Sequence, residues 1–140
     1  MTWILDAKWN PYTGETTFNW KPTMNKKLLY ISGPMTGVVD LNRQAFEDAE
    51  HRLRELGFAC INPHNLPYPD FPEDAGEPEI WAEFLAMDIW MILQTSKPDA
   101  LVMLAGWKRS RGSLLEAAVA RRFGIPVYTY AEILLGKLEA

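Results

Sequence analysis

Residues 108–116 place phosphate-binding groups and a carboxylate close together, between an apolar run and a helical pattern. Ser110, Ser113 and three cations in this segment could bind a phosphate, and Glu116 would project from the first turn of the following helix. The same spacing, Ser113-x-x-Glu116, also fits a capping box, in which the carboxylate only satisfies a backbone N–H group. The residues by themselves favour the capping box.

Residues 33–37 are a second candidate for phosphate binding, because they join an apolar run at 28–32 to a helical pattern. Glycines at both ends let the backbone approach a ligand, and the N–H groups that begin the next helix attract anions. The segment lacks the Gly-Lys-Ser/Thr of a Walker loop and the G-x-G-x-x-G of a dinucleotide-binding turn. An ordinary tight turn therefore explains the spacing at least as well as a phosphate loop.

Asp88 lies in a nearly apolar helical pattern, where a carboxylate needs an explanation. Its spacing of three and four places it on one helical face with Trp81, Phe84, Leu85 and Ile92. Burial would raise its pKa toward the range of a proton donor at neutral pH. The alternative, which the pattern alone favours, is a buried Asp that is hydrogen-bonded to the backbone of a neighbouring loop.

Four short apolar runs alternate with longer helical patterns, which predicts β-α-β units around a parallel sheet. Strands are expected at 28–32, 58–62, 100–104 and 125–129. The fold class is therefore α/β, a small doubly wound parallel sheet of the flavodoxin-like or Rossmann-like kind. Ligands bind beyond the carboxyl ends of the strands in such sheets, so residues 33–37 and 108–116 should face one pocket.

Apolar residues that recur every three or four positions predict the helices of this fold. Helices are expected at 41–56, 79–93, 113–123 and 131–138. Asp40 is the expected N-cap of the first helix, and Gly57 and Gly124 are expected to end the first and third.

Two segments fall outside this alternation. Residues 1–23 carry five aromatic residues around Asn10-Pro11-Tyr12-Thr13-Gly14, which predicts a β-hairpin with aromatic cross-strand pairs. This hairpin extends a main domain, 24–140, and either packs on it or offers an edge for oligomerisation. Residues 63–78 hold half of the ten prolines and predict an ordered loop, either a lid over a site or a rigid surface crossover.

Composition excludes several classes of protein. Apolar residues make up 48% of the 140 residues, which is enough for one hydrophobic core and excludes disorder. Fourteen basic against eighteen acidic residues give a net charge of −4, so the fold has no basic footprint for duplex nucleic acid. No uncharged run reaches the ~18 residues that span a bilayer, and Asp6 and Lys8 interrupt the place of a signal peptide. We expect a cytoplasmic protein with no membrane partner.

The remaining reactive residue types predict no further site. The single cysteine, Cys60, excludes an intrachain disulfide and a Cys-based zinc site. His51 lies among charged residues on a predicted helix and is expected to be solvated. His64 could contact a ligand, but it has no metal-binding companion at a suitable spacing.

Taken together, the three candidate segments resemble the nucleoside 2-deoxyribosyltransferase superfamily, and most closely its 2′-deoxynucleoside 5′-monophosphate N-hydrolase branch. The resemblance spans about residues 28–129. It rests on Tyr30-x-x-Gly33 with the turn to Gly37, on Asp88, and on Ser110-x-Gly112-x-x-x-Glu116. The opening Y-I-S-G-P-M-T-G also resembles an uncharacterised group of phage and bacterial proteins attached to this superfamily.

The resemblance implies an N-glycosidase in which Glu116 attacks C1′ of the sugar and forms a glycosyl ester. Asp88 would orient the sugar or donate a proton, and Tyr30 would lie beside the nucleophile. The 5′-phosphate would be held by Gly33, Pro34, Met35, Thr36, Gly37, Ser110 and Gly112. Neither the resemblance nor the residues imply a cofactor or a metal.

The chain departs from the N-hydrolase pattern at Pro34 and Thr36, where that branch carries a Ser and an Arg. Arg109 or Arg111 would compensate. The expected substrate is a nucleoside 5′-monophosphate, in its deoxy form. Two alternatives stay open, a deoxyribosyltransferase acting on nucleosides and a non-catalytic nucleotide-binding module. The aromatic residues of the hairpin and of the 79–93 helix predict a homodimer or larger homo-oligomer.

Overall fold

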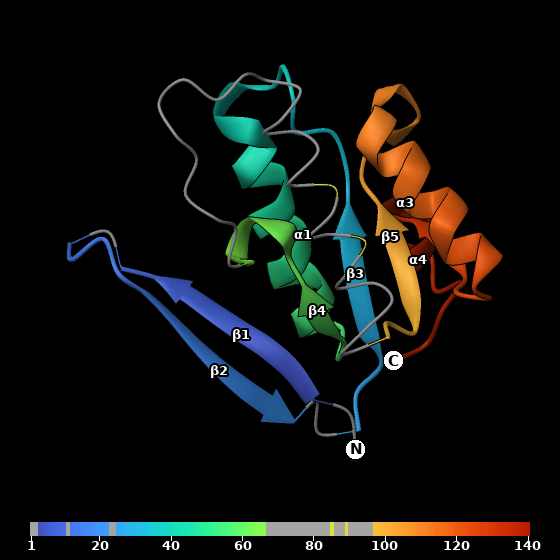
Figure 1. The fold of residues 1–140 in the computed structure, drawn as a ribbon. Helices are drawn as coiled ribbons and strands as arrows, with labels where there is room; N and C mark the ends of the chain where they lie inside the picture. Colours follow the sequence, from blue (N-terminus) through green and yellow to red (C-terminus); the bar gives the residue numbers. More distant parts are fainter. Residues whose placement is uncertain (1–2, 11, 23–24, 67–84, 86–88, 90–96) are drawn as a thin grey trace.

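A four-stranded parallel sheet forms the centre of the fold (Figure 1). The computed structural model describes residues 3–10, 12–22, 25–66, 85, 89 and 97–140. Its strands are β3 (Leu28–Ser32), β4 (Ala59–Ile61), β5 (Ala100–Met103) and β6 (Val127–Thr129), arranged in the order β4-β3-β5-β6. The predicted α/β fold class with a parallel sheet is confirmed.

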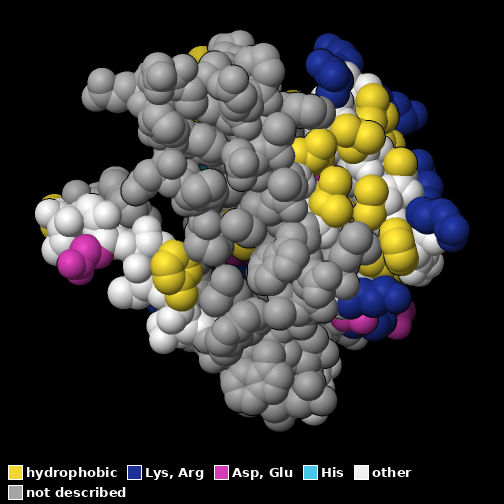
Figure 2. Space-filling view, viewed as in Figure 1, with side chains coloured by type: hydrophobic (Ala, Val, Ile, Leu, Met, Phe, Trp, Pro, Cys, Tyr) yellow, Lys and Arg dark blue, Asp and Glu magenta, His cyan; other side chains and the backbone are white. Residues whose placement is uncertain are grey.

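Helices cover both faces of this sheet, as the doubly wound class requires. Helix α1 (Arg43–Glu55) packs on one face together with α4 (Tyr130–Leu134), and α3 (Arg111–Arg122) packs on the other. The outer side of α3 is exposed, and Figure 2 shows hydrophobic side chains gathered over this helix beside Lys and Arg side chains.

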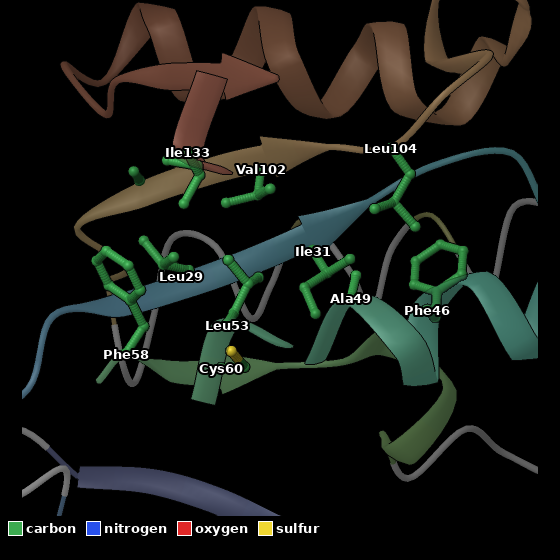
Figure 3. Close-up of a cluster of buried hydrophobic side chains, with 11 residues drawn as sticks. Leu29, Ile31, Phe46, Ala49, Leu53, Phe58, Cys60, Val102, Leu104 and Ile133 are labelled. Atoms are coloured by element: carbon green, nitrogen blue, oxygen red, sulfur yellow. The ribbon is translucent and has the colours of Figure 1, made fainter. Parts of the chain in front are cut away.

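Alternate residues of β3 belong to two separate hydrophobic cores, because successive side chains of a strand point to opposite faces of the sheet. Leu29 and Ile31 pack with α1 (Figure 3), whereas Leu28 and Tyr30 pack toward α3. All five residues of β3 are buried, which is the pattern expected of a central strand. The core on the α1 side contains Leu29, Ile31, Phe46, Ala49, Leu53, Phe58, Cys60, Ala100, Val102, Leu104 and Ile133.

Helix α1 begins later than predicted and without the predicted cap. Asp40 and the next two residues have positive φ angles of 51°, 52° and 61°, and Asn42 precedes the helix without a side-chain capping bond. Asp40 instead forms an ion pair with Arg43 at 3.6 Å. The prediction of Asp40 as N-cap is therefore wrong, because three left-handed residues turn the chain before the helix can start.

The end of α1 follows the prediction. Gly57 has a φ of 100°, which residues with a side chain rarely adopt. The N–H group of Phe58 then donates to the carbonyl of Leu53 at 3.1 Å, as in a Schellman ending. Because this N–H group is used by the helix, β4 starts at Ala59, one residue later than predicted.

A related ending explains why β6 is shorter than predicted. Gly124 has a φ of 76°, and the N–H group of Ile125 donates to the carbonyl of Ala120 at 2.8 Å. Pro126 has no N–H group to donate to a neighbouring strand. The ladder therefore begins at Val127 instead of residue 125. Helix α4 is also shorter than the predicted 131–138, since it ends at Leu134.

The N-terminal hairpin consists of β1 (Trp3–Trp9) and β2 (Thr16–Pro22), which pair antiparallel. Their register sets Ala7 opposite Phe18 and Trp9 opposite Thr16. The hairpin prediction is confirmed, but its aromatic residues form no directly opposed pairs, because each of them in one strand faces a non-aromatic residue of the other.

Two predicted elements lie wholly or partly outside the described residues. Of the predicted 79–93 helix, only residues 85 and 89 are described. The proline-rich segment is described only up to residue 66. The start of that segment forms a short 3-10 helix, η2 (Pro63–Asn65). No helix in the described part of the chain is long and apolar enough to cross a membrane.

We expect Phe46→Ala to lower the free energy of unfolding by about 3–5 kcal/mol, because Phe46 is completely buried between α1 and the sheet. Leu135→Ala is the control, since Leu135 is 77% exposed and its loss should cost about 1 kcal/mol or less. Urea unfolding of both variants measures the difference. Equal losses would contradict this assignment of the core.

Candidate functional site

The carboxyl ends of β3 and β5 form the topological switch point of the sheet. The chain leaves β3 for β4 on one side and then returns to β5 on the other, so the connections diverge between β3 and β5. In open α/β sheets the crevice at this point is where ligands bind. Residues at this edge are therefore the first candidates for a site.

The segments that follow β3 and β5 lie side by side at this edge. A Cβ atom added to Gly33 would lie 2.9 Å from Cβ of Leu104, which is closer than real contacts allow. A Cβ atom on Gly106 would lie 3.4 Å from Cγ of Pro34. The absence of a side chain at residue 33 therefore serves the packing of the two segments on each other, a reason that the sequence spacing did not indicate.

Glu116 meets Ser32 at this edge of the sheet. The hydroxyl of Ser32, the last residue of β3, donates a hydrogen bond to Oε1 of Glu116 at 3.0 Å. Only 1% of Ser32 and 5% of Glu116 are exposed. The carboxyl group of α3 is thus held inside the protein at the carboxyl end of the central strand.

The capping box that the residues favoured for Glu116 is wrong. Ser110 is the N-cap of α3, and its hydroxyl accepts the N–H group of Ser113 at 3.2 Å. The N–H group of Leu114 donates to the carbonyl of Ser110, which fixes the helix start two residues before the predicted one. Glu116 is therefore six residues beyond the cap, too far along the helix to close a capping box.

Tyr30 lies on the same side of the sheet as this hydrogen bond. It precedes Ser32 by two residues in β3, so both side chains face α3. It is completely buried and belongs to the core that includes Ala117 and Ala120 of α3. The structure thus brings Tyr30, Ser32 and Glu116 to one face of the sheet.

Residues 33–37 form a turn whose members differ in burial. Gly33 is buried, Pro34 and Met35 are half-buried, and Thr36 and Gly37 are exposed. Met35 packs against the core on the α1 side, and its carbonyl accepts the N–H group of Val38 at 3.1 Å. The expected helix start does not follow directly, since residues 38–42 separate this turn from α1. Phosphate binding by the turn stays a prediction.

Of the other predicted site residues, Gly112 lies in the first turn of α3, two residues after the Ser110 cap. Asp88 lies outside the described residues. Ser32 is a site residue that sequence reasoning missed. The sequence did contain an indication of it, because Ser32 is a small polar residue at the end of an otherwise apolar strand.

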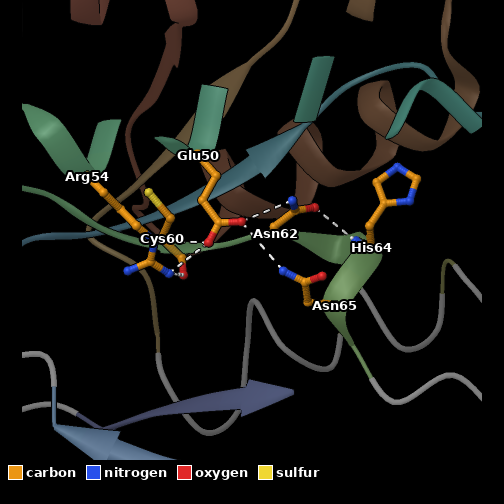
Figure 4. A network of polar contacts seen from close by, with 6 residues as sticks. All are labelled: Glu50, Arg54, Cys60, Asn62, His64 and Asn65. Atoms are coloured by element: carbon orange, nitrogen blue, oxygen red, sulfur yellow. Dashed lines mark hydrogen bonds and ion pairs between the residues drawn. The ribbon is translucent and has the colours of Figure 1, made fainter. Parts of the chain in front are cut away.

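A second polar cluster joins α1 to the end of β4 (Figure 4). Glu50 accepts hydrogen bonds from Nδ2 of Asn62 at 3.1 Å and of Asn65 at 3.5 Å, and from Nε of Arg54 at 2.9 Å. Burial raises the pKa of the neighbouring Cys60 thiol to about 12, so this cysteine stays protonated near neutral pH. The cluster fixes η2 against α1 and provides no nucleophile.

His64 follows this cluster and packs edge-on against Phe46, with ring centroids 4.8 Å apart. Its Nε2 atom is buried and has no hydrogen-bond partner in the described part of the chain. Burial lowers the pKa of His64 below 6.5, and the Arg43 guanidinium lowers it further, while the Leu41 carbonyl and the Asp40 carboxylate oppose this. The neutral imidazole is therefore favoured.

The described residues hold no group of three His, Cys, Asp or Glu side chains that could bind a metal ion. Residues 27–129, more than half of the chain, match the family described as a domain of unknown function, DUF4406. Comparison with curated proteins finds no match.

We expect His64 to reduce stability as the pH falls. Its folded-state pKa lies below the unfolded value of about 6.5, so the unfolded chain binds the proton first and the free energy of unfolding decreases below that pH. Between about pH 7.5 and pH 5 the wild type should lose more stability than His64→Gln. If the free energy of unfolding depended on pH in the same way for wild type and His64→Gln, His64 would not be the source of this pH dependence.

Proposed function

The chain belongs to the DUF4406 family, and we propose that it hydrolyses the N-glycosidic bond of a nucleoside 5′-monophosphate, preferentially the 2′-deoxy form. The observation that carries the proposal is the buried hydrogen bond between Ser32 and Glu116 at the switch point of the sheet. Neither capping nor surface solvation explains this carboxyl group. Its position instead suits a nucleophile that acts on a ligand bound at the carboxyl ends of the strands.

Glu116 performs the covalent step in this proposal. Its carboxylate attacks C1′, so that a C1′–O ester bond forms while the C1′–N bond breaks and its electron pair leaves with the base. Water then attacks C1′, the ester bond breaks and the carboxylate is restored, while the proton that the water loses replaces the proton taken up by the leaving base. The products are the free base and the sugar 5-phosphate.

Ser32 orients the nucleophile. Its hydroxyl donates to Oε1 and thereby restricts rotation of the carboxyl group on a rigid helix and strand. Tyr30 lies on the same strand face, and its proposed place is beside the nucleophile. Asp88 is proposed to orient the sugar or to protonate the leaving base, as the resemblance to the N-hydrolases implies.

The start of α3 supplies phosphate-binding groups about two helical turns from Glu116. Ser110 caps the helix, Gly112 lies in its first turn, and backbone N–H groups at such an end stabilise anions. Lys108, Arg109 and Arg111 are exposed around it and add positive charge. The turn at residues 33–37 lies against this segment through Pro34 and Gly106 and is proposed to share the phosphate.

A 2′-deoxy sugar suits this mechanism on chemical grounds. The transition state of glycosidic cleavage resembles an oxocarbenium ion. A 2′-hydroxyl withdraws electrons from C1′ and makes that cation harder to form. The proposed reaction needs neither a cofactor nor a metal. We propose that it takes place in the cytoplasm.

We propose a homodimer or larger homo-oligomer as the working assembly. Leu114, Leu115 and Phe123 are 44%, 43% and 55% exposed on the outer side of α3. An exposed apolar group of this kind is typical of an interface. A second copy of the chain is its proposed partner.

We expect Glu116→Gln to reduce base release by at least about a thousandfold, the scale of losing a nucleophile. Gln retains an oxygen that accepts the Ser32 hydroxyl, so the variant should fold, and a nucleoside monophosphate should raise its melting temperature as in the wild type. Glu47→Gln, an exposed position on α1, should retain full activity.

A chromatographic screen of common nucleoside monophosphates for released base is the measurement. Activity surviving in Glu116→Gln would remove Glu116 from the mechanism. Ligand-induced stabilisation without turnover in the wild type would indicate a binding module. Base exchange that dominates over release when a second base is added would indicate a deoxyribosyltransferase.

Light scattering at micromolar concentration should give a mass of at least twice 16.0 kDa. Leu114→Glu should shift the mass toward the monomer, because it places a charge on the exposed face of α3. A monomeric wild type would contradict the proposed assembly.

A further inference from the structure

Ser113 is a buried polar residue that the proposed reaction has not used. It is 1% exposed, and its backbone N–H group donates to the Ser110 hydroxyl. Its own Oγ atom is buried and has no hydrogen-bond partner in the part of the chain that the structure describes. Serines near a helix start usually bond to a nearby backbone carbonyl. A buried hydroxyl without that bond requires another explanation, and one explanation is that it forms a hydrogen bond to a bound ligand.

The position of Ser113 along α3 indicates which part of a ligand it would meet. Ser110, Ser113 and Glu116 follow one another at intervals of three residues, so each is a neighbour of the next on the helix surface. A rise of about 1.5 Å per residue separates successive members by about 4.5 Å along the axis. The hydroxyl of Ser113 is therefore midway between the cap and the carboxylate.

A sugar 5-phosphate carries oxygen atoms between its phosphorus and its anomeric carbon. The atoms that link its phosphorus to the anomeric carbon are the 5-oxygen, C5, C4 and the ring oxygen. If the phosphate lies at Ser110 and the anomeric carbon at Glu116, the atoms beside Ser113 include two oxygens that accept hydrogen bonds. Neither oxygen donates, so only a donor such as a hydroxyl group can satisfy them.

We propose that Ser113 is a substrate-binding residue whose hydroxyl donates to the 5-oxygen or ring oxygen of a sugar 5-phosphate. The inference rests on the proposed function and deepens it, because it makes α3 select for a phosphate joined to a sugar over a phosphate alone. Ser110 binds the phosphate end, Ser113 binds the linking oxygen, and Glu116 reaches the anomeric carbon.

The test uses Ser113→Ala in the full chain, with 2-deoxyribose 5-phosphate and inorganic phosphate as calorimetric probes. The variant should bind 2-deoxyribose 5-phosphate about three- to tenfold more weakly than the wild type and should bind inorganic phosphate equally well. Its melting temperature without ligand should be unchanged or higher, since the substitution removes a buried hydroxyl that has no partner. In turnover, KM should rise while kcat changes little.

Ser110→Ala is the matched control. It removes the N-cap, so it should lower the melting temperature without ligand. It should also weaken the binding of both 2-deoxyribose 5-phosphate and inorganic phosphate. Ser113→Cys keeps the size and a weak donor and should bind the sugar phosphate with intermediate affinity.

The results that overturn the inference differ from those that overturn the function. Wild-type affinity for the sugar phosphate in Ser113→Ala, with base release intact in the wild type, rejects the role of Ser113 alone. A lower melting temperature of Ser113→Ala with unchanged ligand affinity assigns Ser113 to the structure and also rejects it. A wild type that neither releases base nor binds 2-deoxyribose 5-phosphate rejects both proposals.

Discussion

The hydrogen bond from Ser32 to Glu116 is the interaction on which the candidate site depends. Burying a carboxyl group is costly unless polar groups compensate, and a carboxylate is stabilised more strongly by hydrogen bonds than a neutral acid is. Ser32 provides such a bond from the end of the central strand. The sheet and α3 therefore cannot be considered separately, because the carboxyl group is positioned only when both have their observed register.

The start of α3 sets that register. Each residue of a helix turns the side-chain direction by about 100°, so a start displaced by one residue would point Glu116 away from β3. Ser110 fixes the start by accepting the Ser113 N–H group, and the left-handed Gly106 just before it lies against Pro34 of the neighbouring segment. The capping serine thus positions the carboxylate through the helix, whether or not it also contacts a ligand.

The sheet was predictable from sequence because its strands are apolar on both faces, and β3 occupies the predicted residues 28–32. The failures occurred where tertiary contacts outweighed local spacing. Ser113-x-x-Glu116 fits a capping box locally, yet Ser110 caps the helix and Ser32 binds the carboxyl group. Three left-handed residues from Asp40 to Asn42 have no spacing signal, and a tight contact with Leu104 explains Gly33 only once two distant segments are adjacent.

Small residues on α3 complete the geometry. Ala117 and Ala120 are buried in the same core as Tyr30, and their short side chains let the helix axis lie close to the sheet at β5 and β6. A carboxylate on this helix can therefore reach a serine on the strand, since its three-carbon side chain has little length to spare. A larger residue at 117 would move the helix outward and lengthen the bond from Ser32. The packing of two alanines that contact no ligand is thus a condition for any chemistry at Glu116.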